Sequence, residues 1–206
     1  MASYFVSQPL IGVAGLNAVY STPAAGPSGL GYPWTSSTLN PLPSVPIEQM
    51  FGQIVQAQNP DPTVGGGGEF IFLRVPTSTT VTAGLLYSWG DSGSGYDVVL
   101  LPTSASTTTT SGIPIAVAIN AVTSSSTLTQ ATWFQVQGRC TVLKDAVKMA
   151  PGAPVYFSKA AGGRVRVIGS AFYGIIGMRS ATLTTITTTT SSALMYVNRP
   201  SLTVAI

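Results

Sequence analysis

The stretch Trp133-Phe-Gln-Val-Gln-Gly-Arg-Cys-Thr-Val-Leu143 alternates between apolar and polar residues more cleanly than any other part of the chain. Side chains of a β-strand point in turn to the two faces of its sheet. A period of two with one apolar face therefore predicts a half-buried antiparallel strand. The predicted buried side carries Phe134, Val136, Gly138, Cys140 and Val142, and the other side carries Gln135, Gln137, Arg139 and Thr141.

Short apolar runs before and after this stretch also have the composition of strands. Segments rich in Gly, Ser and Thr separate them, and residues 158–163 contain the glycines of a hairpin loop. The runs cover residues 70–75, 85–89, 96–101, 113–122, 155–157, 164–168, 172–176 and 194–197. Their number and spacing predict an all-β domain over residues 69–206, folded as an antiparallel β-barrel or β-sandwich.

Residues 1–68 differ from the rest of the chain because they hold nine of its fifteen prolines. Proline fixes φ and lacks an amide donor, so this density excludes long helices and central strands. Apolar and aromatic residues run through the segment, unlike a flexible Gly/Ser linker. We expect a long extended N-terminal arm that lies on a surface, either of its own β-domain, of a sister subunit or of a different protein. The residues expected to make this contact are Tyr4, Phe5, Leu10, Tyr20, Tyr32, Trp34 and Phe51.

Two local features are predicted near the end of the arm. Residues 47–58 are expected to form one short helix, because Pro46 suits a position near a first helical turn. Residues 65–68 are all glycine and predict a flexible or tight joint between arm and body. A phosphate-binding loop is not indicated, because no Gly-Lys-Ser/Thr follows and Glu69 would repel phosphate.

Charged residues make up only 7% of the chain, against about 25% in an average soluble protein. Such a chain presents Ser, Thr, Gly and Gln to water or buries much of its surface against partners. Residues 1–73 carry three acidic and no basic residues, whereas residues 74–206 carry nine basic and three acidic ones. The basic residues are scattered singly, so we expect solvated charges or contacts with an acidic protein lattice, and no nucleic acid.

The sequence offers little for catalysis. There is no histidine, and Cys140 lies on the apolar side of its predicted strand, which indicates a buried, inert thiol. One cysteine without histidine excludes an internal disulfide and a zinc site of His and Cys ligands within one chain. Asp91 and Asp97 could serve calcium binding or glycoside hydrolysis, but such residues are more often hairpin turn formers. We expect no enzyme activity, cofactor or metal.

The order of several short motifs resembles the small head decoration, or cement, proteins of tailed bacteriophages, which are typically encoded beside the major capsid protein. The motifs are Gly68-Glu-Phe-Ile-Phe-Leu73, Val81-Thr-Ala-Gly84, Ile115-Ala-Val-Ala-Ile119, Trp133-Phe-Gln-Val-Gln-Gly138, Ala150-Pro-Gly-Ala-Pro-Val-Tyr156 and Val197-Asn-Arg-Pro200. The chain departs from the pattern in its first 45 residues and in the Thr/Ser segments 103–111 and 184–192.

The resemblance implies a structural virion protein that binds the capsid exterior and stabilises contacts between major capsid subunits. We also expect a homo-oligomer on the capsid, formed through an exposed strand edge or the arm, and either a dimer or a trimer suits capsid symmetry axes. The start of the chain lacks the charged and apolar regions of a secretory signal, and no stretch reaches the roughly 18 apolar residues of a membrane span. We therefore expect synthesis in the host cytoplasm and no membrane partner.

Two other functions remain open from the sequence. One is a tail-fibre or receptor-binding module of a phage virion, against which the absence of a fibre-like repeat counts. The other is a calcium-stabilised or hydrolytic surface enzyme, for which only Asp91 and Asp97 speak.

Overall fold

The computed structural model describes residues 5–6, 20–22, 51–58, 67–90, 95–101, 112–127, 129–158, 160–167 and 174–202. These residues form β-strands joined by turns and loops, and none of them lies in a helix. Every strand pair is antiparallel. The prediction of an all-β, antiparallel fold is confirmed.

Most strands coincide with predicted apolar runs. The strands are β1 (Phe5–Val6), β2 (Tyr20–Thr22), β3 (Ile54–Gln58), β4 (Gly68–Val75), β5 (Thr80–Val81), β6 (Leu86–Ser88), β7 (Val99–Leu100), β8 (Ile115–Ala118), β9 (Val122–Thr123), β10 (Thr129–Leu143), β11 (Pro154–Phe157), β12 (Val165–Arg166), β13 (Gly174–Ser180) and β14 (Ser192–Leu202). Strands β1, β2, β3 and β5 lie outside the predicted runs. The exclusion of central strands from residues 1–68 is wrong for β3, which pairs with both β1 and β4 because residues 54–58 contain no proline. As predicted, β11 and β12 form an antiparallel pair on either side of the loop at 158–163.

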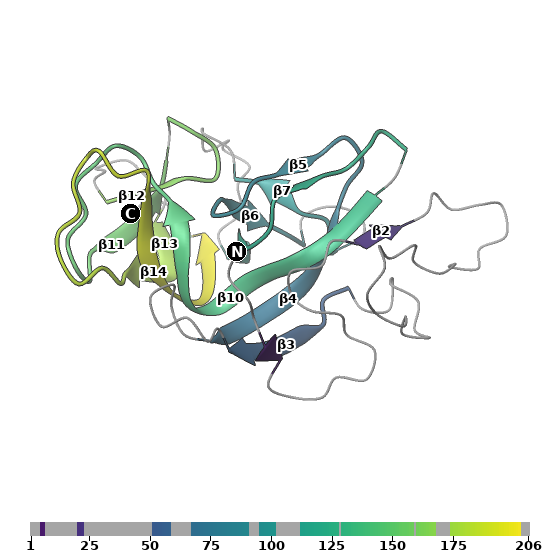
Figure 1. The fold of residues 1–206 in the computed structure, drawn as a ribbon, viewed down its shortest axis with the longest axis horizontal. Coiled ribbons are helices and arrows are strands. Elements are labelled where there is room, and N and C mark those ends of the chain that lie inside the picture. Colours follow the sequence, from purple (N-terminus) through teal and green to yellow (C-terminus); the bar gives the residue numbers. More distant parts are fainter. Residues whose placement is uncertain are drawn as a thin grey trace, which may run out of the picture.

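One sheet holds twelve of these strands, and β5 and β9 form a separate pair. The main path of the twelve-stranded sheet runs β1-β3-β4-β10-β14-β13-β11-β12. Strands β2 and β8 also pair with β10, and β6 links β8 to β7. The long strand β10 connects the two ends of the molecule, with β3 and β4 beside one part of it and β11–β14 at the opposite end (Figure 1). The sheet curls along β10 into a half-barrel.

Strand β10 changes partners along its length. Residues 130–138 pair with β4, and residues 137–143 pair with β14 on the other edge. A bulge between Gln135 and Gln137 and the positive φ of Gly138 (109°) interrupt the regular strand at the point of exchange. Bulges increase local twist and bend a strand, so this irregularity lies where the sheet curls.

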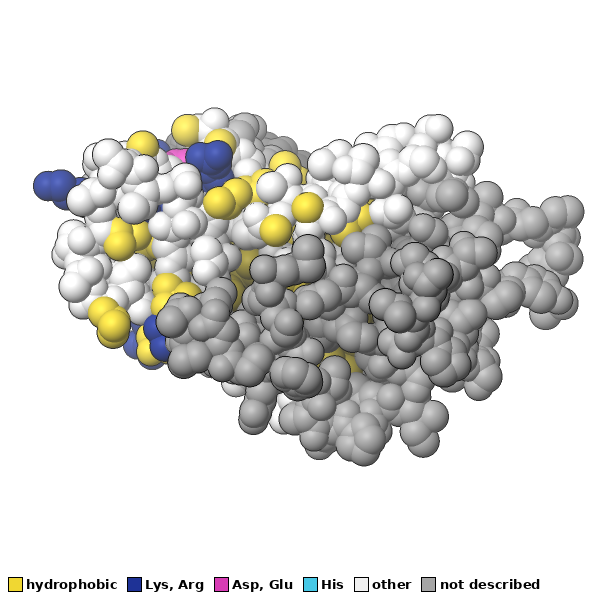
Figure 2. Space-filling model, in the orientation of Figure 1, with side chains coloured by type: hydrophobic (Ala, Val, Ile, Leu, Met, Phe, Trp, Pro, Cys, Tyr) yellow, Lys and Arg dark blue, Asp and Glu magenta, His cyan; other side chains and the backbone are white. Residues whose placement is uncertain are grey.

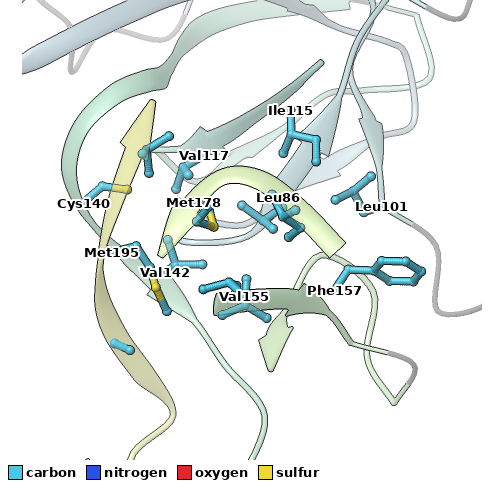
Figure 3. Close-up of a cluster of buried hydrophobic side chains, with 14 of the residues drawn as sticks. Leu86, Leu101, Ile115, Val117, Cys140, Val142, Val155, Phe157, Met178 and Met195 are labelled. Atoms are coloured by element: carbon cyan, nitrogen blue, oxygen red, sulfur yellow. The ribbon is translucent and has the colours of Figure 1, made fainter. Parts of the chain in front are cut away.

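The predicted apolar side of β10 faces two hydrophobic clusters. Phe134 and Val136 pack with residues of β4, β6 and β8. Cys140 and Val142 belong to the cluster drawn in Figure 3, where they meet Met178 and Met195 from β13 and β14. Four of the five residues predicted for this side are therefore buried, and Gly138 is half-buried.

The other side of β10 differs from its prediction. We call residues 129–136 the covered half and residues 137–143 the open half. In the covered half, residues 131–136 are buried on both faces, including Gln135 at 0% exposure, so the half-buried prediction is wrong there. Trp133 packs on Phe72 (centroids 4.9 Å apart), and Phe51 stacks on Phe72 in turn (5.9 Å). The prediction holds in the open half, where Thr141 is exposed.

The predicted helix at 47–58 is wrong over residues 54–58, which form β3, while residues 47–50 lie outside the described residues. Val55 and Ala57 are buried, and Ile54 and Gln56 are exposed, which is the period of a strand. The unpaired edge of β4 offers these residues a ladder of hydrogen bonds, and tertiary context of this kind overrides weak helix propensity.

The glycine joint also lies closer to the body than expected. Gly68 is the first residue of β4, and a Cβ atom there would lie 1.8 Å from the Gln137 carbonyl oxygen. At Gly68 the joint is therefore tight. Strand β3 pairs with β4 across this joint, so the last part of the predicted arm belongs to the same sheet as the β-domain. Apart from residues 51–58, residues 67–68 and the backbone of β1 and β2, the predicted arm lies outside the described residues.

Candidate functional site

Three polar side chains from three strands meet where β4, β10 and β14 lie side by side. Arg199 donates to Glu69 Oε2 from Nε (3.1 Å) and Nη2 (2.9 Å). Gln137, with its amide nitrogen turned toward Glu69, donates to Oε2 at 3.0 Å and to Oε1 at 3.1 Å. The Glu69 side chain is 14% exposed, so its charge is largely withdrawn from water and held by these two partners.

Close backbone contacts surround this group, and we call the whole the strand junction. Gly138 lies opposite Gly68 in the ladder, and a Cβ atom on Gly138 would lie 2.3 Å from the Gly67 carbonyl oxygen. The buried Gln135 donates from Nε2 to the carbonyl oxygens of Gln137 (3.0 Å) and Arg139 (3.2 Å). Its amide thus adds two hydrogen bonds to backbone carbonyl groups beside the bulge.

The strand junction brings together three of the motifs behind the phage resemblance. Glu69 comes from the Gly68–Leu73 motif, Gln137 and Gly138 from the 133–138 motif, and Arg199 from the 197–200 motif. The local sequence patterns did not predict that these residues meet. A signal was present: Glu69 is a single acid in a strand of otherwise mostly apolar residues.

The residues considered for catalysis or calcium binding do not form a site among the described residues. Asp97 forms an ion pair with Arg74, whose Nη2 donates to Asp97 Oδ2 at 2.7 Å, and Asp91 lies outside the described residues. In the described part of the chain, no three His, Cys, Asp or Glu side chains lie close enough together to hold a metal ion. Asp97 is therefore neutralised by an arginine and is not paired with a second described acid.

Cys140 is buried as expected. Its side chain is 4% exposed and belongs to the cluster around Met178 and Met195. Burial away from charge raises the pKa of the Cys140 thiol far above its ordinary value, because the low-dielectric surroundings disfavour the thiolate. The thiolate is the nucleophilic form, so this position suits packing and not reaction.

Lys144 is buried, which was not predicted from the sequence. Its ammonium group donates to the carbonyl oxygens of Asp145 (3.1 Å), Val147 (2.9 Å) and Thr187 (3.1 Å). Burial lowers its pKa, and neighbouring Asp145 opposes that shift. The contact with Thr187 fastens the Thr/Ser loop at 184–191, so this lysine is explained by a structural role.

Most of the residues predicted for partner contact lie outside the described part of the chain. Tyr4, Leu10, Tyr32 and Trp34 lie outside the described residues, and only the backbone is described for Phe5 and Tyr20, in β1 and β2. Phe51 is half-buried and stacks on Phe72 of the same chain. This contact fixes the residues just before β3 to the sheet.

A second group of side chains lies on the outward face of the open half. Arg139 in β10, Tyr196 in β14 and Arg179 in β13 occupy one row across three neighbouring strands. The guanidinium carbon of Arg139 lies 5.7 Å from the centre of the Tyr196 ring, and that of Arg179 lies 6.0 Å from it. We call these three residues the Arg–Tyr row. The period-two pattern placed Arg139 on the polar side of its strand, but the row itself depends on register between strands.

The same face continues toward β11 and β12. Pro154 lies opposite Arg179, and Arg166 lies opposite Tyr156. The basic side chains visible in Figure 2 lie at the end of the molecule that holds β11–β14. Arg139, Arg166 and Arg179, which are isolated in the sequence, thus lie on neighbouring strands of this part of the sheet.

Neither models of known protein families nor curated protein sequences match this chain. The described residues contain no helix long and apolar enough to cross a membrane. The class that the structure defines is an all-β protein built on one curled antiparallel sheet.

Proposed function

We propose that this chain is a structural virion protein that binds the exterior of a phage capsid and stabilises contacts between major capsid subunits. The observation that carries the proposal is the strand junction. Three motifs of the resemblance, spread over 130 residues, supply the ion pair, the amide and the glycines of one unit. The three motifs therefore share one physical requirement, which is that β4, β10 and β14 lie close together side by side.

The composition supports the same function. A surface with few charges binds another protein surface at a lower desolvation cost, because few charged groups lose their water on binding. Among the described residues, no three His, Cys, Asp or Glu side chains lie close enough together to hold a metal ion. A chain of this kind acts by contact, and many copies bound to one lattice reinforce one another.

The proposed mechanism is a clamp across subunit boundaries. Capsid shells resist the pressure of packaged DNA, and a protein that buries surface on two neighbouring subunits opposes their separation. Residues 1–50 are proposed to add to this contact through their apolar side chains, and the chain is proposed to act as a dimer or trimer on a capsid symmetry axis.

The test is direct binding to capsids that lack the chain. Purified full-length protein is mixed with undecorated capsids of the phage that carries its gene, and the particles are sedimented and imaged by electron microscopy. We expect saturable co-sedimentation, density on the outer surface and greater resistance of the shell to heat. Absence of binding overturns the proposal, and attachment to host cells without capsid binding favours a receptor-binding module instead.

A further inference from the structure

The Arg–Tyr row presents two cations in a fixed arrangement. Arg139 and Arg179 approach the Tyr196 ring from the strands on either side of it, at 5.7 and 6.0 Å from its centre. Attraction between a guanidinium group and an aromatic ring orients both arginines. Side chains that are already oriented lose less conformational freedom when they bind a partner.

The charge of the row is not neutralised by described residues. The acids in the described part of the chain have other partners: Glu69 bonds Arg199, Asp97 bonds Arg74, and Asp145 accepts from Ser158 Oγ at 2.6 Å. Arg139 Nε is buried and has no hydrogen-bond partner among the described residues. Because this nitrogen is buried, another molecule does not reach it, and the exposed guanidinium group of Arg179 is the part of the row that a partner can contact.

We infer that Arg139, Tyr196 and Arg179 form a docking surface for carboxylate groups of an acidic protein. The guanidinium group presents donors in a planar fork that matches a carboxylate, and such paired bonds are among the stronger ones in proteins. The outward face of a sheet is broad and open, which suits another protein surface. That the acidic protein is the capsid rests on the proposed function, whereas the carboxylate chemistry does not.

A nucleic acid fits the row less well. Single-stranded nucleic acids bind by stacking bases on free aromatic faces, and here two guanidinium groups already lie within 5.7 and 6.0 Å of the centre of the Tyr196 ring. Binding to duplex DNA relies on many phosphate contacts along the backbone. The row offers two arginines within one short span, which matches a small group of carboxylates better.

The experiment uses the full chain and three probes: poly-L-glutamate, an oligo(dT) strand of similar charge, and undecorated capsids. Arg179→Glu reverses one charge of the row, and Lys148→Glu makes the same change at an exposed lysine in the loop after β10. Arg179→Lys keeps the charge without the planar fork. Circular dichroism and thermal unfolding check that all variants fold.

We expect the unaltered chain to bind poly-L-glutamate, and Arg179→Glu to weaken that binding by about tenfold or more. Lys148→Glu should change it by less than about twofold, and Arg179→Lys should fall between the two. Equal loss in Arg179→Glu and Lys148→Glu overturns the inference, as does tighter binding of oligo(dT) than of poly-L-glutamate.

The measurement with undecorated capsids separates this inference from the proposed function. If the unaltered chain binds capsids and Arg179→Glu binds them equally well, the row is not the docking surface, while the proposed function stands. If the unaltered chain does not bind capsids, the proposed function fails, and binding to poly-L-glutamate still decides the chemistry of the row.

Discussion

The two halves of strand β10 belong to one continuous period-two pattern, yet they have different surroundings. In the covered half even the polar Thr132 and Gln135 are buried, and Trp133 packs on Phe72. In the open half Thr141 is exposed and Arg139 faces outward beside Tyr196. The difference shows that an alternating pattern identifies the core side of a strand but does not show what covers its other side.

The comparison also assigns different tasks to the two halves. Residues of the covered half pair with β4 and with β8, so changes there should act on the stability of the fold. The outer face of the open half carries the exposed Thr141 and lies beside the exposed Tyr196, so changes at exposed residues there should act on binding and leave folding nearly intact. The predictions below test that division.

The largest effect is expected from removing strand β3. Deleting residues 1–64 takes away the four residue pairs between β3 and β4 together with the Phe51–Phe72 contact. The edge of β4 and the covered half then meet water, and the free energy of unfolding should fall by more than in any variant below. Deleting residues 1–50 retains these contacts and is the matched control. Equal unfolding temperatures for the two truncated chains would show that β3 does not support the sheet.

The next prediction compares the aromatic Trp133 in the covered half with the aromatic Tyr196, which lies beside the open half. Trp133→Ala removes a fully buried ring and should lower the free energy of unfolding by about 3–5 kcal/mol. Tyr196 is 47% exposed, so Tyr196→Ala should lower it by about 1 kcal/mol or less. Chemical denaturation of both variants measures the difference. Similar losses would mean that the outer face of the open half is also covered.

The boundary between the halves is tested by Gly138→Ala. A new Cβ atom would lie 2.3 Å from the Gly67 carbonyl oxygen, at a φ of 109° that strains an L-residue, so we expect a loss of about 3 kcal/mol. Gly152→Ala is the control, because φ there is also positive (69°) but no heavy atom lies within 4 Å of the new Cβ. Its loss should stay near about 1 kcal/mol. Equal losses would attribute the effect to backbone strain alone.

The smallest effect distinguishes the two faces within the open half. Cys140→Ser places a hydroxyl group in the apolar cluster around Met195 and should lower the free energy of unfolding by about 1–3 kcal/mol. Thr141→Ser, on the exposed face, should change it by about 0.5 kcal/mol or less. A thiol reagent should modify Cys140 only after unfolding. Rapid modification of the folded chain would contradict its burial.

Much of the fold was predictable because strand patterns are local. The alternation at 133–143 and the apolar runs at 70–75 and 155–157 each correspond to a strand of the structure. The predicted helix at 47–58 was wrong over residues 54–58, because a neighbouring strand edge outweighed local propensity. The candidate site was less predictable, since Glu69 and Arg199 are 130 residues apart and meet only through β10.

The sequence by itself determined the all-β class, the apolar side of β10 and the burial of its single cysteine. These properties follow from the alternation of side chains along an extended backbone and from the residues that interrupt it. Only the tertiary structure decided which strands are neighbours, where β10 exchanges β4 for β14, and that Arg139 and Arg179 lie on either side of Tyr196. The physical reason is that register between distant strands is set by bulges, close glycine contacts and packing across the sheet, none of which is encoded in a local period.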